Sequence, residues 1–254
     1  MKKLKGYLLM MAVLPAAFMV GCENKNSAPS APATILTTFA TPQTAQGPVN
    51  LLSTANFAVL ASTQITNSGP TTICGDIGLS EGVSAGSGYL LTCGGVAHIT
   101  DSVAASAQSD LTTAYDDAAG RAVQGNQGAS VAGDLGGVTL YPGLYKSAGL
   151  LEIVSGDLTL DAQGNTNAVF IFQVGLTLTT GPGRSVILAG GAQAANIFWQ
   201  VSNMCELDSG TVFQGTILAH DQILLDSGAV LVGRALSEVG QVAMLSNTIT
   251  EPTL

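Results

Sequence analysis

Paired carboxylates are the first residues of this chain that could perform chemistry. Asp116 and Asp117 are adjacent, while Asp208 and Asp226 occupy equivalent positions in two copies of a repeated motif. Two carboxyl groups on either side of a glycosidic bond can act as general acid and base in its hydrolysis. Carboxylates stacked on neighbouring coils could instead hold calcium, but the chain contains no Gly-Gly-x-Gly-x-Asp loop. Neither pair by itself therefore identifies an active site.

The composition argues against catalysis. The chain has 254 residues, of which only 10% are charged and 5% aromatic, and it contains a single tryptophan, Trp199. Its eight Lys and Arg residues cannot form the broad basic surface that nucleic acids require. His98 and His220 lack zinc-site spacing, and no phosphate-binding loop or Gly-x-Ser-x-Gly elbow occurs. We therefore expect a protein that is not an enzyme and needs no metal or cofactor.

A Ser-Gly motif recurs through the chain. Leu207–Gly215 matches Leu225–Gly233 eighteen residues later, a third copy begins at Ser246, and weaker copies begin at Ser68 and Thr180. Short strands rich in alternating Leu and Thr lie between the copies. Outward Ser and Thr, repeated at every coil, could hold water in an ordered, ice-like array, although outward Thr is also simply suited to strands.

The elements that must position these residues follow from the repeat. Segments of about eighteen residues, each with short strands and glycine turns, predict a β-helix, whose coils bury their apolar sides only when stacked. A β-sandwich is the alternative, but the fixed phase of the Ser-Gly motif favours the solenoid. The segment Asp101–Gly120 has no strand signals and predicts one helix packed against a face. Its apolar stripe consists of Val103, Ala107, Leu111, Ala114 and Ala118.

The N-terminus is typical of an exported protein. Residues 1–21 carry three lysines before an apolar run too short to span a bilayer, which predicts a secretory signal. The run ends Met19-Val20-Gly21-Cys22, which resembles the lipobox of bacterial lipoproteins, so we expect lipid attachment at Cys22. Loss of the signal leaves five basic and 17 acidic residues, a net charge near −12. Contact with a membrane is then expected only through the lipid anchor, on the outer membrane or cell surface; without acylation the protein would be secreted.

The remaining chain divides into a linker and one domain. Residues 22–48 contain four prolines among small polar residues and predict a flexible linker, and residues 49–254 are expected to form the β-helix domain. In an oxidising compartment Cys74 and Cys93 are the natural pair for a disulfide. Cys205 is expected to be a buried thiol.

Several sequence blocks resemble one family. They are Asn56–Ala61, Gly75–Gly78, Thr113–Arg121, Leu140–Tyr145, Val169–Gln173, Gly190–Val201 and Gly233–Leu236. In this order they are similar to the ice-binding (antifreeze) proteins of cold-adapted bacteria, diatoms and fungi. The resemblance covers about residues 50–254. It implies a right-handed, discontinuous β-helix of triangular section, in which the N-terminal coil stacks against C-terminal coils. It also implies a variable cap over 83–99, where the disulfide resembles one in some relatives.

The resemblance further implies adsorption to an ice crystal through one flat face, often marked by Thr-Ala/Gly-x-Thr/Asn at a coil corner. This chain departs from that motif, because Ser stands in most first positions and Val, Gly or Ile in most last positions. Valine keeps the shape of threonine but loses the hydroxyl. The expected ice-binding residues are Ser68, Thr71, Thr180, Ser209, Thr211, Val212, Ser227, Val230, Ser246 and Thr248. We expect a monomer; the alternative is a surface-anchored adhesion module that binds polysaccharide or protein.

Overall fold

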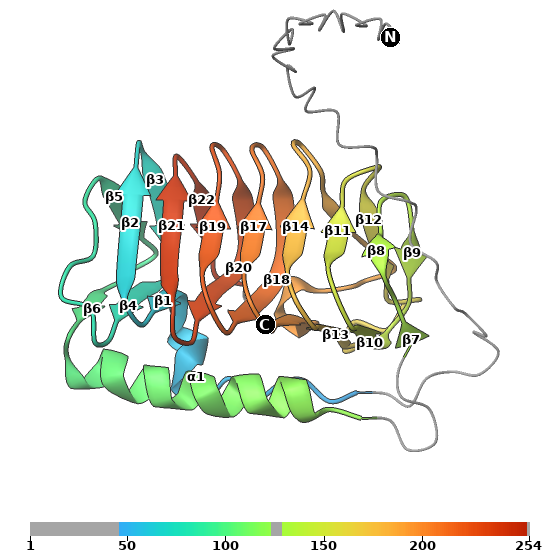
Figure 1. Ribbon diagram of the computed structural model, residues 1–254, viewed down its shortest axis with the longest axis horizontal. Coiled ribbons are helices and arrows are strands. Elements are labelled where there is room, and N and C mark those ends of the chain that lie inside the picture. Colours follow the sequence, from blue (N-terminus) through green and yellow to red (C-terminus); the bar gives the residue numbers. More distant parts are fainter. Residues whose placement is uncertain (1–45, 123–128, 253–254) are drawn as a thin grey trace, which may run out of the picture.

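The chain folds into a solenoid of short parallel strands with one long helix beside it (Figure 1). The computed structural model describes residues 46–122 and 129–252. The predicted signal, Cys22 and most of the linker lie outside the described residues. The β-helix prediction is confirmed, and within the described ranges no helix is long and apolar enough to cross a membrane.

The solenoid has three faces, which we name the helix face, the seven-stranded face and the third face. The helix face consists of β7 (Ala129–Ser130), β10 (Gly143–Ser147), β13 (Phe170–Val174), β16 (Ile197–Val201), the C-terminal halves of β18 (Val212–Ala219) and β20 (Val230–Ser237), β1 (Phe57–Ala61), β4 (Asp76–Leu79) and β6 (Ala97–Ile99). The seven-stranded face consists of β8 (Gly133–Asp134), β11 (Leu151–Ile153), β14 (Leu178–Thr180), β17 (Cys205–Leu207), β19 (Ile223–Leu225), β21 (Gln241–Leu245) and β2 (Gln64–Ser68).

The third face runs behind the seven-stranded face in Figure 1. It consists of β9 (Thr139–Leu140), β12 (Leu158–Asp161), β15 (Val186–Ala189), the N-terminal halves of β18 and β20, β22 (Thr248–Thr250), β3 (Thr71–Cys74) and β5 (Tyr89–Thr92). A bridge between Ser185 and Val212 joins β15 to β18. The eight-residue strands β18 and β20 belong to two faces, and Gly215 and Gly233 lie in register where each strand passes from one to the other. A Cβ on Gly233 would lie 1.9 Å from the carbonyl oxygen of Gly215, so this corner requires glycine.

The coils are not stacked in sequence order. Strand β2 pairs with β21, with Ile65 opposite Val242, and β3 pairs with β22, with Ile73 opposite Ile249. The N-terminal coil therefore closes against the C-terminal coil, as the resemblance implied. After β6 the chain enters α1 (Ser102–Gly120), which runs along the helix face to the opposite end of the solenoid. There β7 begins the series of coils that stack back toward the N-terminal coil.

Helix α1 matches the predicted segment with one correction to its buried stripe. Asp101 caps its start by accepting from the Ala104 N–H, and Ala104 rather than Val103 belongs to the buried stripe, because Val103 is 47% exposed. The helix includes Gly120 as its last residue, and Arg121 follows in an extended conformation. Its final carbonyls accept hydrogen bonds from the Gln173 amide on the helix face.

Inside the solenoid, an aromatic ladder follows the register of the helix face. Tyr145, Phe172 and Trp199 stack in register, with ring centroids 5.1 and 3.8 Å apart, and the Phe213 ring, on the third-face half of β18, lies tilted against Trp199 at 5.0 Å. The Trp199 indole donates to the carbonyl of Gln214 at 2.9 Å, so its one polar atom is satisfied. These ring contacts pack neighbouring coils against one another.

The cysteine predictions are confirmed. Cys74 and Cys93 form a disulfide, which ties β5 to β3 at the end of the third face. Cys205 is fully buried in β17, and burial raises the pKa of its thiol, which therefore stays protonated.

Candidate functional site

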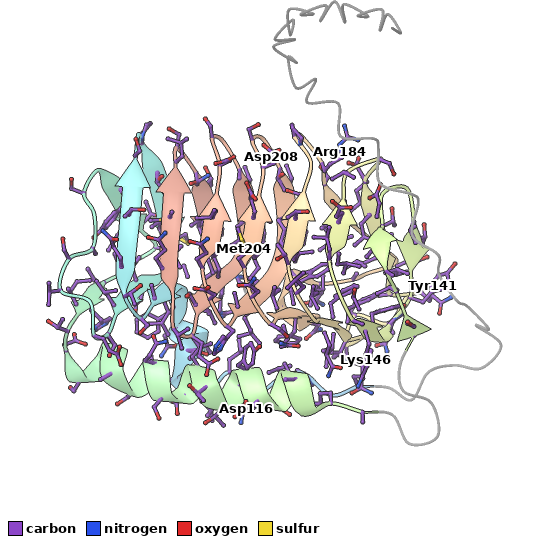
Figure 2. All side chains as sticks on the ribbon, viewed as in Figure 1. Asp116, Tyr141, Lys146, Arg184, Met204 and Asp208 are labelled. Atoms are coloured by element: carbon purple, nitrogen blue, oxygen red, sulfur yellow. A yellow bond between two sulfur atoms is a disulfide. The ribbon has the colours of Figure 1, made fainter. Side chains whose placement is uncertain are left out.

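The carboxylates considered as acid–base pairs lie at the surface, where Asp116 is exposed and Asp117, Asp208 and Asp226 are half-buried. Asp116 points away from the solenoid on the outer side of α1 (Figure 2). Asp117 pairs with Arg121 at 2.7 Å, and this hydrogen bond holds the pKa of its carboxyl below the ordinary value. Asp208 and Asp226 follow β17 and β19 at the rim of the seven-stranded face. Among the described residues no group of three or more His, Cys, Asp and Glu side chains could hold a metal ion.

Asp134 is buried and holds two coils together. Its carboxylate accepts from the backbone N–H groups of Gly136, Val154 and Ser155 at 2.8, 2.9 and 2.9 Å. Burial raises the pKa of Asp134, but a hydrogen bond from the Ser155 side chain and these backbone hydrogen bonds together outweigh it and leave the pKa below the ordinary value. A buried carboxylate that accepts from several donors of two neighbouring turns in this way is a structural group.

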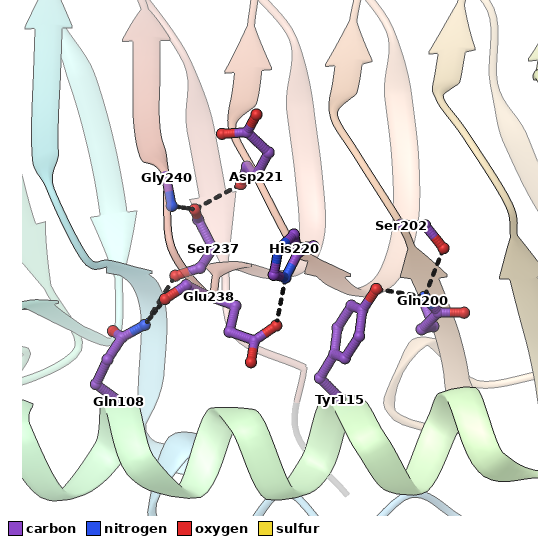
Figure 3. A network of polar contacts seen from close by, with 9 residues as sticks. All are labelled: Gln108, Tyr115, Gln200, Ser202, His220, Asp221, Ser237, Glu238 and Gly240. Atoms are coloured by element: carbon purple, nitrogen blue, oxygen red, sulfur yellow. Dashed lines mark hydrogen bonds and ion pairs between the residues drawn. The ribbon is translucent and has the colours of Figure 1, made fainter.

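Polar side chains between α1 and the helix face form a structural network (Figure 3). Gln108 donates to the carbonyl of Glu238, whose carboxylate lies 2.8 Å from Nδ1 of His220. Further along the helix, the Gln200 amide donates to the Tyr115 hydroxyl at 2.8 Å. These contacts fix the helix on its sheet.

The turns of the Ser-Gly motif line one edge of the solenoid, between the seven-stranded face and the third face (Figure 1). We call Ser68, Ser209, Ser227 and Ser246 the crest. Backbone hydrogen bonds join successive turns, such as Ser246 N–H to the Ser68 carbonyl at 2.9 Å. Ser68, Ser209 and Ser227 are exposed and Ser246 is half-buried. The crest therefore presents one serine per coil along this edge.

Three of the expected ice-binding residues lie inside the solenoid instead. Thr71, Thr180 and Thr211 are 1%, 5% and 0% exposed. The hydroxyls of Thr180 and Thr211 are 2.8 Å apart, and Thr180 also accepts from the Asp208 N–H, while Thr71 accepts from the Asn247 N–H. These hydroxyls satisfy the backbone of the turns, so we correct their assignment: they cannot touch a crystal.

The other expected residues on this side lie on the surface of the third face. Val212, Val230 and Thr248 stand in register on β18, β20 and β22, and the row continues with Thr72 on β3. All four side chains point outward. A second outward row runs two residues further along each strand. None of the expected ice-binding residues belongs to this second row, although alternation along the strand from Thr248 or Val230 points to it. The row consists of Ile187, Gln214, Val232, Thr250, Cys74 and Thr92.

Charge distinguishes this surface from the seven-stranded face. From β15 to β5, the outward positions of the third face carry no ionisable side chain. The seven-stranded face carries Glu152 and Glu206 on its strands, with Asp208 at its rim, where it is labelled in Figure 2. The third face thus offers two in-register rows of methyl, hydroxyl and amide groups.

Comparison with known proteins agrees with this architecture. The family model described as ice-binding-like matches residues 59–250. The ice-binding protein of Nostoc sp. (strain HG1) is 39% identical over 204 residues, which span 80% of this chain and 74% of the relative. The crystal structure of an ice binding protein from an Antarctic biological consortium has a TM-score of 0.80 at 46% identity and covers 84% of this chain and 96% of its own. An ice-binding protein from an Arctic yeast has a TM-score of 0.73 at 29% identity, over 82% and 95% of the two chains.

Proposed function

Because the chain belongs to the ice-binding-like family, we propose that it adsorbs to ice through the third face and the crest and inhibits ice growth or recrystallisation. Relatives with this fold are named ice-binding proteins. The observation that carries the choice of surface is the pair of charge-free, in-register rows between β15 and β5. No enzymatic activity is proposed.

Hydration distinguishes a charge-free surface from a charged one when each meets ice. A charged side chain holds its own water tightly, and removing or reorganising that water at an ice surface is costly. Methyl groups beside short hydroxyls hold water less tightly but in fixed positions. Parallel strands stacked about 4.8 Å apart repeat these groups at equal intervals, and the hydrogen-bonded coils fix them before ice is met. Adsorbed molecules then curve the ice front between them, which stops its advance.

The alternative, an adhesion module for polysaccharide or protein, is not favoured. Sugar-binding surfaces commonly use exposed aromatic rings, and the outward positions of the third face from β15 to β5 carry none. The relatives are named for ice and not for adhesion.

Partition into growing ice tests both the function and the face. The purified protein is expected to enter a slowly grown ice hemisphere, and the double variant Val212→Tyr/Val230→Tyr is expected to stay in the liquid. The matched control is Glu206→Tyr/Leu224→Tyr, which places the same bulk on outward positions of β17 and β19 in the seven-stranded face. Exclusion of the unmodified protein from ice would refute the function, and a glycan-binding screen would follow. Loss of uptake in the control alone would move the site to the seven-stranded face.

We also propose that residues 1–21 direct export, that Cys22 carries the lipid anchor and that 22–48 link it to the domain at 49–254. The support is the charged and apolar pattern of the leader and the Met19-Val20-Gly21-Cys22 sequence. Palmitate labelling of the protein expressed in a bacterium with lipoprotein processing should be lost in Cys22→Ser. Labelling that persists in this variant would contradict the assignment. The domain is expected to sediment as a monomer.

A further inference from the structure

We infer that the hydroxyls of Thr72, Thr248 and Thr250 anchor the bound ice, while the valines beside them supply contact without anchoring. The inference rests on the proposed function and assigns different roles to two halves of the same face. It predicts which side chains need a hydroxyl for adsorption and which need only the shape of valine.

The three threonines form one compact cluster. Thr248 on β22 is paired in register with Thr72 on β3, so their side chains stand about 4.8 Å apart on neighbouring strands. Thr250 lies two residues further along β22, about 6.6 Å away at the rise of a parallel strand. Its partner on β3 is Cys74, whose sulfur is bound to Cys93.

These hydroxyls are free to bind water. Within residues 46–122 and 129–252, no protein group forms a hydrogen bond with the side chains of Thr72, Thr248 or Thr250, and the first two are exposed. The Thr92 hydroxyl on the next strand differs, since it donates to the Ile73 carbonyl at 3.1 Å. Each free hydroxyl offers one donor and two acceptors, and water must occupy them. Their fixed spacing imposes that spacing on the bound waters.

The neighbouring coils present the same backbone without the hydroxyls. Val212 and Val230 continue the row of Thr248, and Val232 continues the row of Thr250. Valine fills the same volume as threonine but gives water no partner. Each strand of this region, β18, β20, β22 and β3, is paired on both sides. The threonine half and the valine half of the face therefore share one rigid backbone frame and differ in their side chains.

Exchange of Thr and Val tests the division, because it changes hydroxyls while it nearly preserves shape. In the complete protein, Thr72→Val/Thr248→Val/Thr250→Val is expected to lower ice uptake by about tenfold or more, since three ordinary hydrogen bonds are lost together. The reciprocal Val212→Thr/Val230→Thr is expected to hold or raise uptake. Thr66→Val/Thr179→Val removes outward hydroxyls from the seven-stranded face and should change uptake by less than about twofold. Thermal unfolding checks that every variant is folded.

The outcomes separate this inference from the proposed function. Uptake of the unmodified protein with equal uptake of the triple valine variant would overturn the anchoring role and leave the function standing. A drop in Val212→Thr/Val230→Thr would show that methyl groups drive adsorption, which also overturns it. Equal losses in the triple variant and the Thr66/Thr179 control would refute the choice of cluster. No uptake of the unmodified protein would refute the function itself.

Discussion

Thr180→Val separates a structural hydroxyl from one that touches ice. Thr180 belongs to the Ser-Gly motif by sequence, yet its side chain is only 5% exposed. Its oxygen accepts from the Asp208 N–H at 2.9 Å and lies 2.8 Å from the Thr211 hydroxyl. Valine would keep the volume and remove both contacts.

The magnitude follows from what is left unpaired. A buried N–H without an acceptor costs about 1–3 kcal/mol, and the lost bond to Thr211 adds about 0.5–1.5 kcal/mol. We expect a net loss of about 2–3 kcal/mol in the free energy of unfolding. For a domain of this size that lowers Tm by about 4–12 °C.

Two measurements on Thr180→Val show whether the Thr180 hydroxyl stabilises the fold or touches ice. Circular dichroism should show the lower Tm, while ice uptake near 0 °C, where the variant remains folded, should equal that of the unmodified protein. Thr179→Val is the control, since its half-buried side chain points outward on the same strand and should change stability by less than about 0.5 kcal/mol. Loss of uptake in Thr180→Val at an unchanged Tm would refute the burial argument.

Three further substitutions test the frame that holds the face. Asp134→Asn should lower the free energy of unfolding by about 2 kcal/mol at neutral pH, because charge-assisted bonds to three backbone N–H groups are weakened. Since the folded pKa of Asp134 is depressed, this contribution exists above the unfolded pKa, about 3.9, and disappears as the pH falls through the folded pKa, so acid titration of both proteins should make their stabilities converge. Cys93→Ser opens a loop with a sequence separation of 19 and should cost about 3 kcal/mol, measured by denaturant unfolding; an unchanged midpoint would contradict it. Gly233→Ala forces a Cβ to within 1.9 Å of a backbone oxygen and should cost about 3 kcal/mol, while Gly149→Ala meets nothing within 4 Å and should be near neutral in the same assay.

The fold was predictable because its signals are local and repeated. The eighteen-residue offset between Leu207 and Leu225 appears in the structure as two paired coils, with β17 beside β19. The helix was predictable for a different reason, since its stripe follows a period of three to four residues. The prediction that Val103 belongs to the buried stripe was wrong, because Ala104, one position later, is the residue that packs against the solenoid.

The site was less predictable because a turn interrupts strand alternation. Gly210 has a φ of +67°, and after it Thr211 points inward while Val212 points outward. A shift of one residue exchanges the core side with the surface side, and four-residue motif counting cannot detect it. The same shift placed Thr71 on the surface. Thr180 was misplaced for a different reason, because it ends β14 in register with Ile153 and continues the inward alternation of Leu178. Their true role, satisfaction of turn backbone, depends on partners in other coils.

The hydroxyl cluster of the third face exists only because the chain closes on itself. Thr72 comes from the first coil and Thr248 from the last, and the pairing of β3 with β22 puts them side by side. Asn247, in the turn before β22, secures this seam: its N–H donates to the Thr71 hydroxyl at 3.1 Å, and its amide donates to the Asp226 carbonyl at 2.7 Å. A buried threonine of the motif thus holds the strand that presents the exposed one. By sequence the copies of the motif look equivalent. In the closed solenoid their hydroxyls differ in role, because those turned inward fix the register of the coils and those turned outward meet water.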